Sequence, residues 1–145
     1  MTTLQSLLSP NLPLVVGVSG GADSLCLLGT LHEAGYPLIV AHFDHRLRPD
    51  SAQGTEFVQR IAAQYKLPFV SESGDVAAYA KEHKETIEEA ARNLRYRFLF
   101  AQARKNNAQA VAVGHTADDQ VETVLMHFLR GAGLNGLKGM ESQII

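Results

Sequence analysis

Short apolar runs that alternate with segments of helical spacing constrain the fold of this chain more than any other feature. The runs cover residues 14–18, 38–41, 67–70 and 109–113. They are too short for helices and lack a polar face, which is typical of strands buried on both sides. Helices are expected over about 22–34, 51–66, 86–106 and 117–130, with a shorter one near 75–84. This alternation predicts an α/β fold, a Rossmann-like three-layer domain with a mostly parallel sheet.

Length and composition fit one domain. The chain has 145 residues, 46% of them apolar and 19% charged, which is enough for one core. Its one cysteine, Cys26, cannot form an internal disulfide, is expected in the core, and favours a reducing, cytoplasmic location. No apolar run approaches the roughly 20 residues of a membrane span, so no membrane contact is expected. No signal peptide is expected either.

Charge is informative in its distribution. The net charge is −2, which does not mark the whole chain as a nucleic-acid binder. Arginines nevertheless gather at Arg46 and Arg48, and again at Arg92, Arg95 and Arg97. They could contact phosphate, or they could be solvated helix faces with local ion pairs.

A glycine-rich loop, Ser19-Gly-Gly-Ala-Asp-Ser24, follows the first predicted strand. Gly20 and Gly21 allow a sharp turn and a close approach of the backbone to a ligand. Their N–H groups, with those of the helix that begins near Ala22, suit a phosphate, and the two serines add hydroxyl donors. Glycine-rich turns also serve strand–helix packing, so the loop alone leaves both roles open.

Asp23 is the unusual residue of this loop. A bare carboxylate beside bound phosphate would repel it, so Asp23 is expected to bind Mg²⁺ shared with the phosphates. The alternative is that Asp23 only complements the positive helix N-terminus. The loop is neither a Walker A motif nor a dinucleotide fingerprint.

The second strand runs into His42-Phe-Asp-His45, which is followed by Arg46-Leu-Arg48. Imidazole and carboxylate are ordinary metal ligands. Histidines three apart across a strand end need not converge, however, and no cysteine lies near them. A structural metal is therefore the weaker interpretation of this segment.

The fourth strand is followed by Gly114-His-Thr-Ala-Asp-Asp-Gln-Val-Glu122. In the predicted helix, Asp119 and Glu122 share a face, and Asp118 lies four residues before Glu122. Clustered carboxylates repel, so a cation such as Mg²⁺ or a lysine ammonium could lie between them. A helix N-terminus that favours acidic residues explains the two aspartates equally well.

These segments resemble the PP-loop ATP pyrophosphatases and, among them, the N-terminal domain of the tRNA(Ile)-lysidine synthetases. The loop at 19–24 is similar to the family's S-G-G-x-D-S motif, and 42–48 is similar to H-x-D-H-x-L-R. Residues 87–99, 114–125 and 129–140 complete five ordered motifs. The resemblance covers about residues 15–140 and implies an adenine nucleotide alpha-hydrolase-like fold.

The resemblance implies a two-step reaction that uses ATP and Mg²⁺. The O2 of the wobble cytidine in tRNA(Ile) with a CAU anticodon attacks the α-phosphate and releases pyrophosphate. The ε-amine of free L-lysine then displaces AMP at C2 and forms lysidine. The modification changes the codon and amino-acid specificity from Met to Ile.

The resemblance also assigns roles to residues. Residues 19–24 and His42 would bind the nucleotide, and Asp23 would hold the metal. Asp119 and Glu122 would recognise lysine, His115 would lie near the reaction centre, and Arg95 would contact phosphate. Tyr96 and Phe98 are expected in the core rather than as stacking platforms.

Two other functions remain as alternatives. A tRNA 2-thiolase of the same family would need paired cysteines, and the chain has one. A non-catalytic adenine-nucleotide-binding module would need the glycine loop but no second cluster of acids. The family continues beyond the position of Ile145, so the chain is expected to be truncated at its C-terminus. The fragment alone could therefore be inactive, and an apolar edge exposed by truncation would favour a homodimer.

Overall fold

The computed structural model describes residues 8–117, 121–129 and 140–144, with residues from 115 onward described by their backbone alone. Its strands are β1 (Leu14–Gly17), β2 (Leu38–Asp44), β3 (Phe69–Ser73), β4 (Ala110–Ala117), β5 (Val121–Leu129) and β6 (Met140–Ile144). Its helices are α2 (Ala22–Glu33), α3 (Ser51–Gln64), α4 (Val76–His83) and α5 (Ile87–Lys105).

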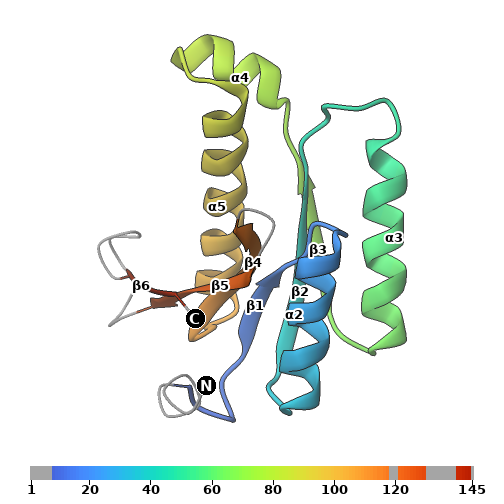
Figure 1. Cartoon of the computed structure of the whole chain (residues 1–145), viewed down its shortest axis with the longest axis vertical. Coiled ribbons are helices and arrows are strands. Elements are labelled where there is room, and N and C mark those ends of the chain that lie inside the picture. The colour runs from blue at the N-terminus through green and yellow to red at the C-terminus, as the bar shows by residue number, and fades with distance from the viewer. Residues whose placement is uncertain (1–7, 118–120, 130–139, 145) are drawn as a thin grey trace.

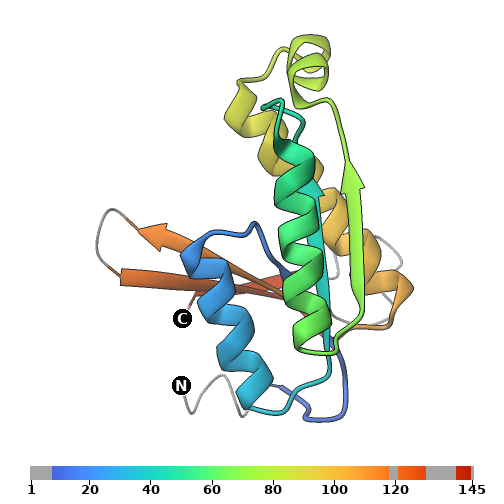
Figure 2. The same cartoon turned by 90° about the vertical axis from the view of Figure 1, so that its right-hand side faces the viewer.

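The strands form one sheet in the order β3-β2-β1-β4-β5-β6. Strands β3, β2, β1 and β4 are parallel to one another, whereas β5 pairs antiparallel with both β4 and β6. Helices α2 and α3 cover one face of the parallel part and α5 covers the other (Figures 1 and 2). The predicted three-layer α/β fold with a mostly parallel sheet is confirmed.

Each face of the sheet has its own apolar core because side chains alternate along a strand. Leu14 and Val16 of β1 pack with α2 and α3, whereas Val15 packs with α4 and α5. The same alternation holds in β4, where Ala112 and Val113 belong to opposite cores. The sheet is therefore buried on both faces, as the unbroken apolar runs indicate.

The helix predicted for 117–130 is wrong. Residues Val121–Leu129 form β5, which pairs with β4 so that Val121 lies opposite Ala117 and Phe128 opposite Ala110. The segment is apolar at most positions and carries β-branched Val121, Thr123 and Val124, which fit a pleated surface. Acidic residues before it favoured a helix start locally, but pairing along all of β4 outweighs such weak propensity. Residues 131–139, whose four glycines in nine positions indicate a loop, lie outside the described residues.

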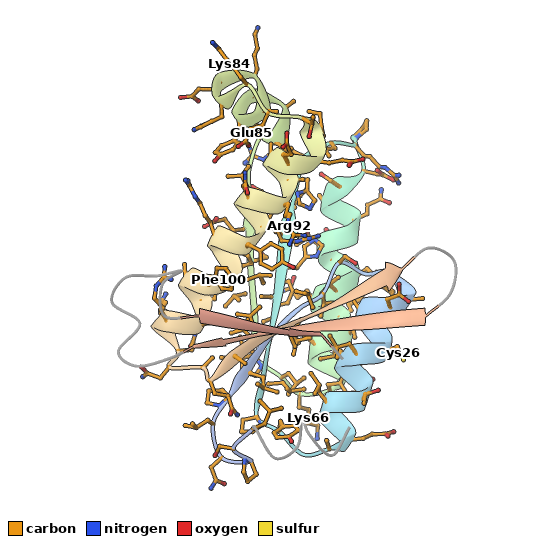
Figure 3. All side chains as sticks on the ribbon, turned by 60° about the vertical axis from the view of Figure 1, so that its left-hand side comes forward. Cys26, Lys66, Lys84, Glu85, Arg92 and Phe100 are labelled. Atoms are coloured by element: carbon orange, nitrogen blue, oxygen red, sulfur yellow. The ribbon has the colours of Figure 1, made fainter. Side chains whose placement is uncertain are left out.

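Other local predictions agree with the structure more closely. The capping box at the start of α5 is present, with Thr86 Oγ1 accepting from Glu89 N and the Glu89 carboxylate accepting from Thr86 N. Tyr96 and Phe98 are buried, at 8% and 3% exposure, as expected of core residues. The core position expected for Cys26 is wrong, because its side chain lies exposed on the outer side of α2 (Figure 3). No described helix is long and apolar enough to cross a membrane.

Candidate functional site

A cavity of about 620 Å³ opens at the carboxyl ends of the parallel strands. Its walls come from the glycine loop after β1, the end of β2 with the following loop, the first turns of α3, the middle of α5 and the end of β4. Among the predicted site residues, those that line it are Ser19, Gly20, Ser24, His42 and Arg95. Ligands of open parallel sheets bind at this edge, which makes the cavity the candidate site.

The glycine loop is organised around the Ser24 hydroxyl. Ser24 Oγ accepts hydrogen bonds from the N–H groups of Ser19 (3.2 Å) and Gly20 (3.3 Å), and it donates to Gly21 O (3.0 Å). Gly21 N donates to Ser19 Oγ at 3.2 Å. Gly20 has a φ of +101°, a conformation that a side chain would strain. The hydroxyl oxygens therefore occupy the acceptor positions to which these loop amides could donate if an anion were bound.

The helix that follows offers further donors. α2 begins at Ala22 after Gly21, and no side chain caps its N-terminus. The first N–H groups of a helix have no intrahelical acceptor, and the helix dipole makes this end positive. An anion bound at the loop would therefore meet both the start of α2 and the hydroxyls of Ser19 and Ser24.

Gly114 brings the end of β4 against this helix start. A Cβ added to Gly114 would lie 3.0 Å from the carbonyl oxygen of Asp23 and 3.5 Å from the backbone nitrogen of Ser24. Only a residue without a side chain permits so close an approach of two backbone segments. His115, the next residue of β4, therefore has its backbone beside the glycine loop.

Asp23, Gly21 and Ala22 are placed differently from the rest of the loop. Gly21 and Ala22 are exposed and Asp23 is half-buried, and none of the three is among the described residues that line the cavity. The backbone of Asp23 lies against Gly114 of β4, and the residue does not line the cavity.

The end of β2 supplies the second wall. His42 is buried and its Nδ1 donates to Val18 O at 2.8 Å, since a carbonyl oxygen can only accept. The Asp44 carboxylate accepts from Arg46 N (2.9 Å) and from Ser51 Oγ (3.2 Å), which fixes the loop between β2 and α3. Within the described residues, no group of three His, Cys, Asp or Glu side chains could hold a metal ion.

His45, which follows β2, and Arg95 of α5 share an unusual feature. Both line the cavity, and both have a buried nitrogen, His45 Nδ1 and Arg95 Nε, without a hydrogen-bond partner in the described part of the chain. Burial lowers the pKa of His45 below its usual value, and the positive charge of Arg95 lowers it further. His45 is therefore a neutral imidazole at pH 7.

The third predicted group of site residues is only partly described. His115 belongs to β4 and directly follows Gly114, so its backbone lies near the glycine loop. Glu122 belongs to β5, where it pairs with Thr116. Asp119 lies outside the described residues, as do the side chains of His115 and Glu122. The shared helical face predicted for Asp119 and Glu122 does not exist, because Glu122 is in a strand.

Sequence reasoning missed two apolar residues of the cavity. Leu47 and Phe57 line it and are 49% and 38% exposed, although both are large and apolar. Phe57 would be 3.7 Å from a Cβ on Gly20, so its ring lies against the glycine loop. Helical spacing in α3 groups Phe57 with the buried residues Val58 and Ala62. The one sequence signal for its exposure is that Phe57 lies at the edge of this apolar face.

The sequence also matches a known protein family. The family model described as a PP-loop domain matches residues 2–144. The chain belongs to the PP-loop domain family. The glycine loop and the cavity described above are therefore features of a PP-loop domain.

Curated relatives narrow the resemblance. The chain is 42% identical over 141 residues to the tRNA(Ile)-lysidine synthase of Dehalococcoides mccartyi. The aligned region covers 94% of this chain and 30% of that protein. The chain is also 42% identical over 139 residues to the enzyme of the same name from Thermus thermophilus, with 95% and 27% covered. The chain thus spans about a third or less of the length of these relatives.

Solved structures share the fold. The U34-tRNA thiolase NcsA from Methanococcus maripaludis superposes with a TM-score of 0.66 over 79% of this chain and 42% of that one, at 18% identity. The NH3-dependent NAD synthetase from Campylobacter jejuni gives 0.58 over 74% and 49%, at 20% identity. At these identities the likeness concerns the fold alone.

Proposed function

We propose that this chain is the ATP-binding catalytic domain of a tRNA(Ile)-lysidine synthase. The identity of 42% over nearly the whole chain to curated relatives of that name carries the proposal. The enzyme would join free L-lysine to C2 of the wobble cytidine of tRNA(Ile) at the expense of ATP. Because the relatives are about three times longer, the remaining parts of such an enzyme would lie outside this chain.

The chemistry of the cavity supports ATP as the nucleotide. The phosphates would lie against the glycine loop, where Ser19, Ser24 and the first N–H groups of α2 are donors. The guanidinium of Arg95 on the opposite wall would add a charge-assisted contact to phosphate. The exposed rings and aliphatic groups of Phe57 and Leu47 would give the base an apolar surface. The volume of about 620 Å³ is within the range of small-molecule sites.

Each step of the reaction would use these groups. When the cytidine O2 attacks the α-phosphate, negative charge gathers on the departing pyrophosphate, and the donors of the glycine loop would stabilise it. Asp23 is the one carboxylate within this loop and would hold Mg²⁺. A bound Mg²⁺ would neutralise the charge shared by the β- and γ-phosphates.

The second step needs a lysine amine without its proton. Asp119 and Glu122 are proposed to recognise the lysine, and His115 is proposed to lie near the reacting atoms, from the segment that follows Gly114. A carboxylate or imidazole there would take a proton from the lysine ammonium, and the resulting amine would then attack C2. The proposal also includes a homodimer, which light scattering of the purified chain would test.

The proposal is tested by two measurements. Calorimetry of this chain with ATP and with GTP should show selective ATP binding. Radiolabelled lysine incorporation into a tRNA(Ile) transcript should then be measured for the chain extended to the length of its relatives. Asp23→Ala should abolish pyrophosphate release in that enzyme while its circular dichroism stays unchanged. Glu33→Ala is the matched control, because Glu33 is an exposed carboxylate at the other end of α2. ATP binding without lysine incorporation by the extended chain would favour a non-catalytic nucleotide-binding module.

A further inference from the structure

Two buried polar atoms in one wall of the cavity are left without partners. They are Nδ1 of His45 and Nε of Arg95, and no described residue accepts from or donates to either. A buried polar atom without a partner is costly, so such a pair in a functional cavity needs an explanation. The two atoms are complementary, since Nε of arginine always carries a hydrogen and Nδ1 of a neutral histidine can accept one.

The packing beneath these side chains connects the strand end that carries His45 to the helix that carries Arg95. His45 packs on the ring of Phe43, at 5.1 Å between centroids, and Phe43 in turn packs on Phe98 of α5 at 5.9 Å. Gly74 leaves room for that ring, because a Cβ there would lie 2.9 Å from Phe43 Cζ. Arg95 precedes Phe98 by three residues and therefore lies one turn along the same helical face. The influence of the Arg95 charge on His45 agrees with this proximity.

We propose that His45 is a positioning residue for Arg95: the two nitrogens are not hydrogen-bonded to each other in this structure, and a rotation of the Arg95 side chain would bring its Nε–H onto His45 Nδ1 and turn the two terminal nitrogens of the guanidinium toward the cavity. An arginine held at Nε presents its remaining donors as a fork, which is the geometry that binds two oxygens of one phosphate. That the bound anion is an ATP phosphate rests on the proposed function. The hydrogen bond between His45 and Arg95 does not.

The pairing requires a specific state of the ring. Nδ1 must be bare, so the neutral tautomer with hydrogen on Nε2 is the one that pairs. Protonation would place a second hydrogen on Nδ1 and a positive charge beside the guanidinium, so the pair would separate. The other charged and titratable groups that act on the ring are His42 and Asp44 on β2. Arg46, Arg48 and Asp50 line the same cavity.

The first arm of the test needs no nucleotide. Long-range proton–nitrogen NMR spectra of the chain labelled at histidine should show His45 as the Nε2–H tautomer at pH 7.5, with the signals assigned by their loss in His45→Asn. Titration to pH 5 should convert this tautomer to the imidazolium. A proton on Nδ1 at pH 7.5 would overturn the proposal.

The second arm measures ATP affinity by calorimetry in a double-mutant cycle. His45→Phe keeps a ring on Phe43 but removes the acceptor, and it should weaken ATP binding about tenfold or more. His45→Asn keeps an acceptor at the position of Nδ1 and should stay within about threefold of the parent chain. With Arg95→Ala in place, His45→Phe should change affinity less than about twofold.

The outcomes separate the two claims. If His45→Phe binds ATP as tightly as the parent chain, His45 does not act through Arg95. The same conclusion follows if His45→Phe still weakens ATP binding when Arg95 has been replaced by alanine. If the parent chain binds no ATP, the proposed function fails, while the tautomer observed by NMR still decides whether His45 can hold Arg95.

Discussion

Replacing Gly114 with alanine tests whether the end of β4 and the start of α2 form one rigid unit. The added Cβ would lie 3.0 Å from Asp23 O and 3.2 Å from Asp23 C, about 0.4 Å closer than ordinary van der Waals contact. Both neighbours are backbone atoms at a helix start, so neither can rotate away as a side chain could. Relief requires β4 and the glycine loop to move apart.

The size of the effect follows from two opposing contributions. Overpacking in a close-packed region costs about 1–3 kcal/mol. Alanine in place of glycine recovers about 0.5–1 kcal/mol by restricting the unfolded chain. Gly114→Ala should therefore lower the free energy of unfolding by about 1–2 kcal/mol, which shifts the urea midpoint downward by about 0.5–1 M. A displaced loop should also weaken ATP binding about tenfold, the equivalent of one hydrogen bond to a charged group.

Urea unfolding followed by circular dichroism measures the first effect, and calorimetry with ATP measures the second. Gly54→Ala is the matched control, because Gly54 also lines the cavity but an added Cβ there meets nothing within 4 Å. It lies inside α3, so the substitution should stabilise the chain by about 0.5–1 kcal/mol. If Gly114→Ala matches the parent chain in both measurements, the close contact between β4 and α2 is not a structural requirement.

Three further predictions concern single hydrogen-bonding groups. Ser24→Ala removes the acceptor of the Ser19 and Gly20 amides, and should lower the free energy of urea unfolding by about 1–3 kcal/mol. The backbone N–H of Thr86 is the main cause of the lowered pKa of Glu89, and the Thr86 side chain is the second. Thr86→Ala keeps the N–H and removes the hydroxyl, so the pKa of Glu89 in NMR titrations should rise only part of the way toward its usual value. The lowered pKa of His45 means that the unfolded chain binds its proton more readily. Its contribution to stability should therefore be complete above about pH 6.5 and be lost as pH falls through the folded pKa, and His45→Phe should remove that dependence.

The sequence predicted the parallel part of the sheet because its signals were strong and local. The apolar runs at β1, β2 and β4 are longer than a turn and shorter than a helix, so a buried strand is the structure that fits them best. The Thr86 capping box marked the start of α5 by its own hydrogen bonds. The position of three polar segments at one edge followed from parallel order, and the cavity does contain parts of the glycine loop and the end of β2.

Where prediction failed, a distant partner determined the structure. Acidic residues ahead of Val121 favoured a helix, but the long ladder with β4 made the segment a strand. Cys26 carries no signal for its direction, because one apolar residue can occupy either side of a helix such as α2. Its exposure follows from the buried positions Ser24, Leu27 and Leu28, which turn position 26 outward.

Gly114 illustrates why the site needed the structure as well as the sequence. In the sequence it is one more glycine after a strand, and any turn could account for it. In the structure its missing side chain is what lets the backbone of Asp23 approach β4. The glycine loop and β4 therefore cannot move independently, since a shift of one is transmitted through backbone contact to the other. A phosphate that displaces the Ser24 hydroxyl from the loop amides would thus also act on the chain that carries His115, which links nucleotide binding to the position of the proposed second-step residues.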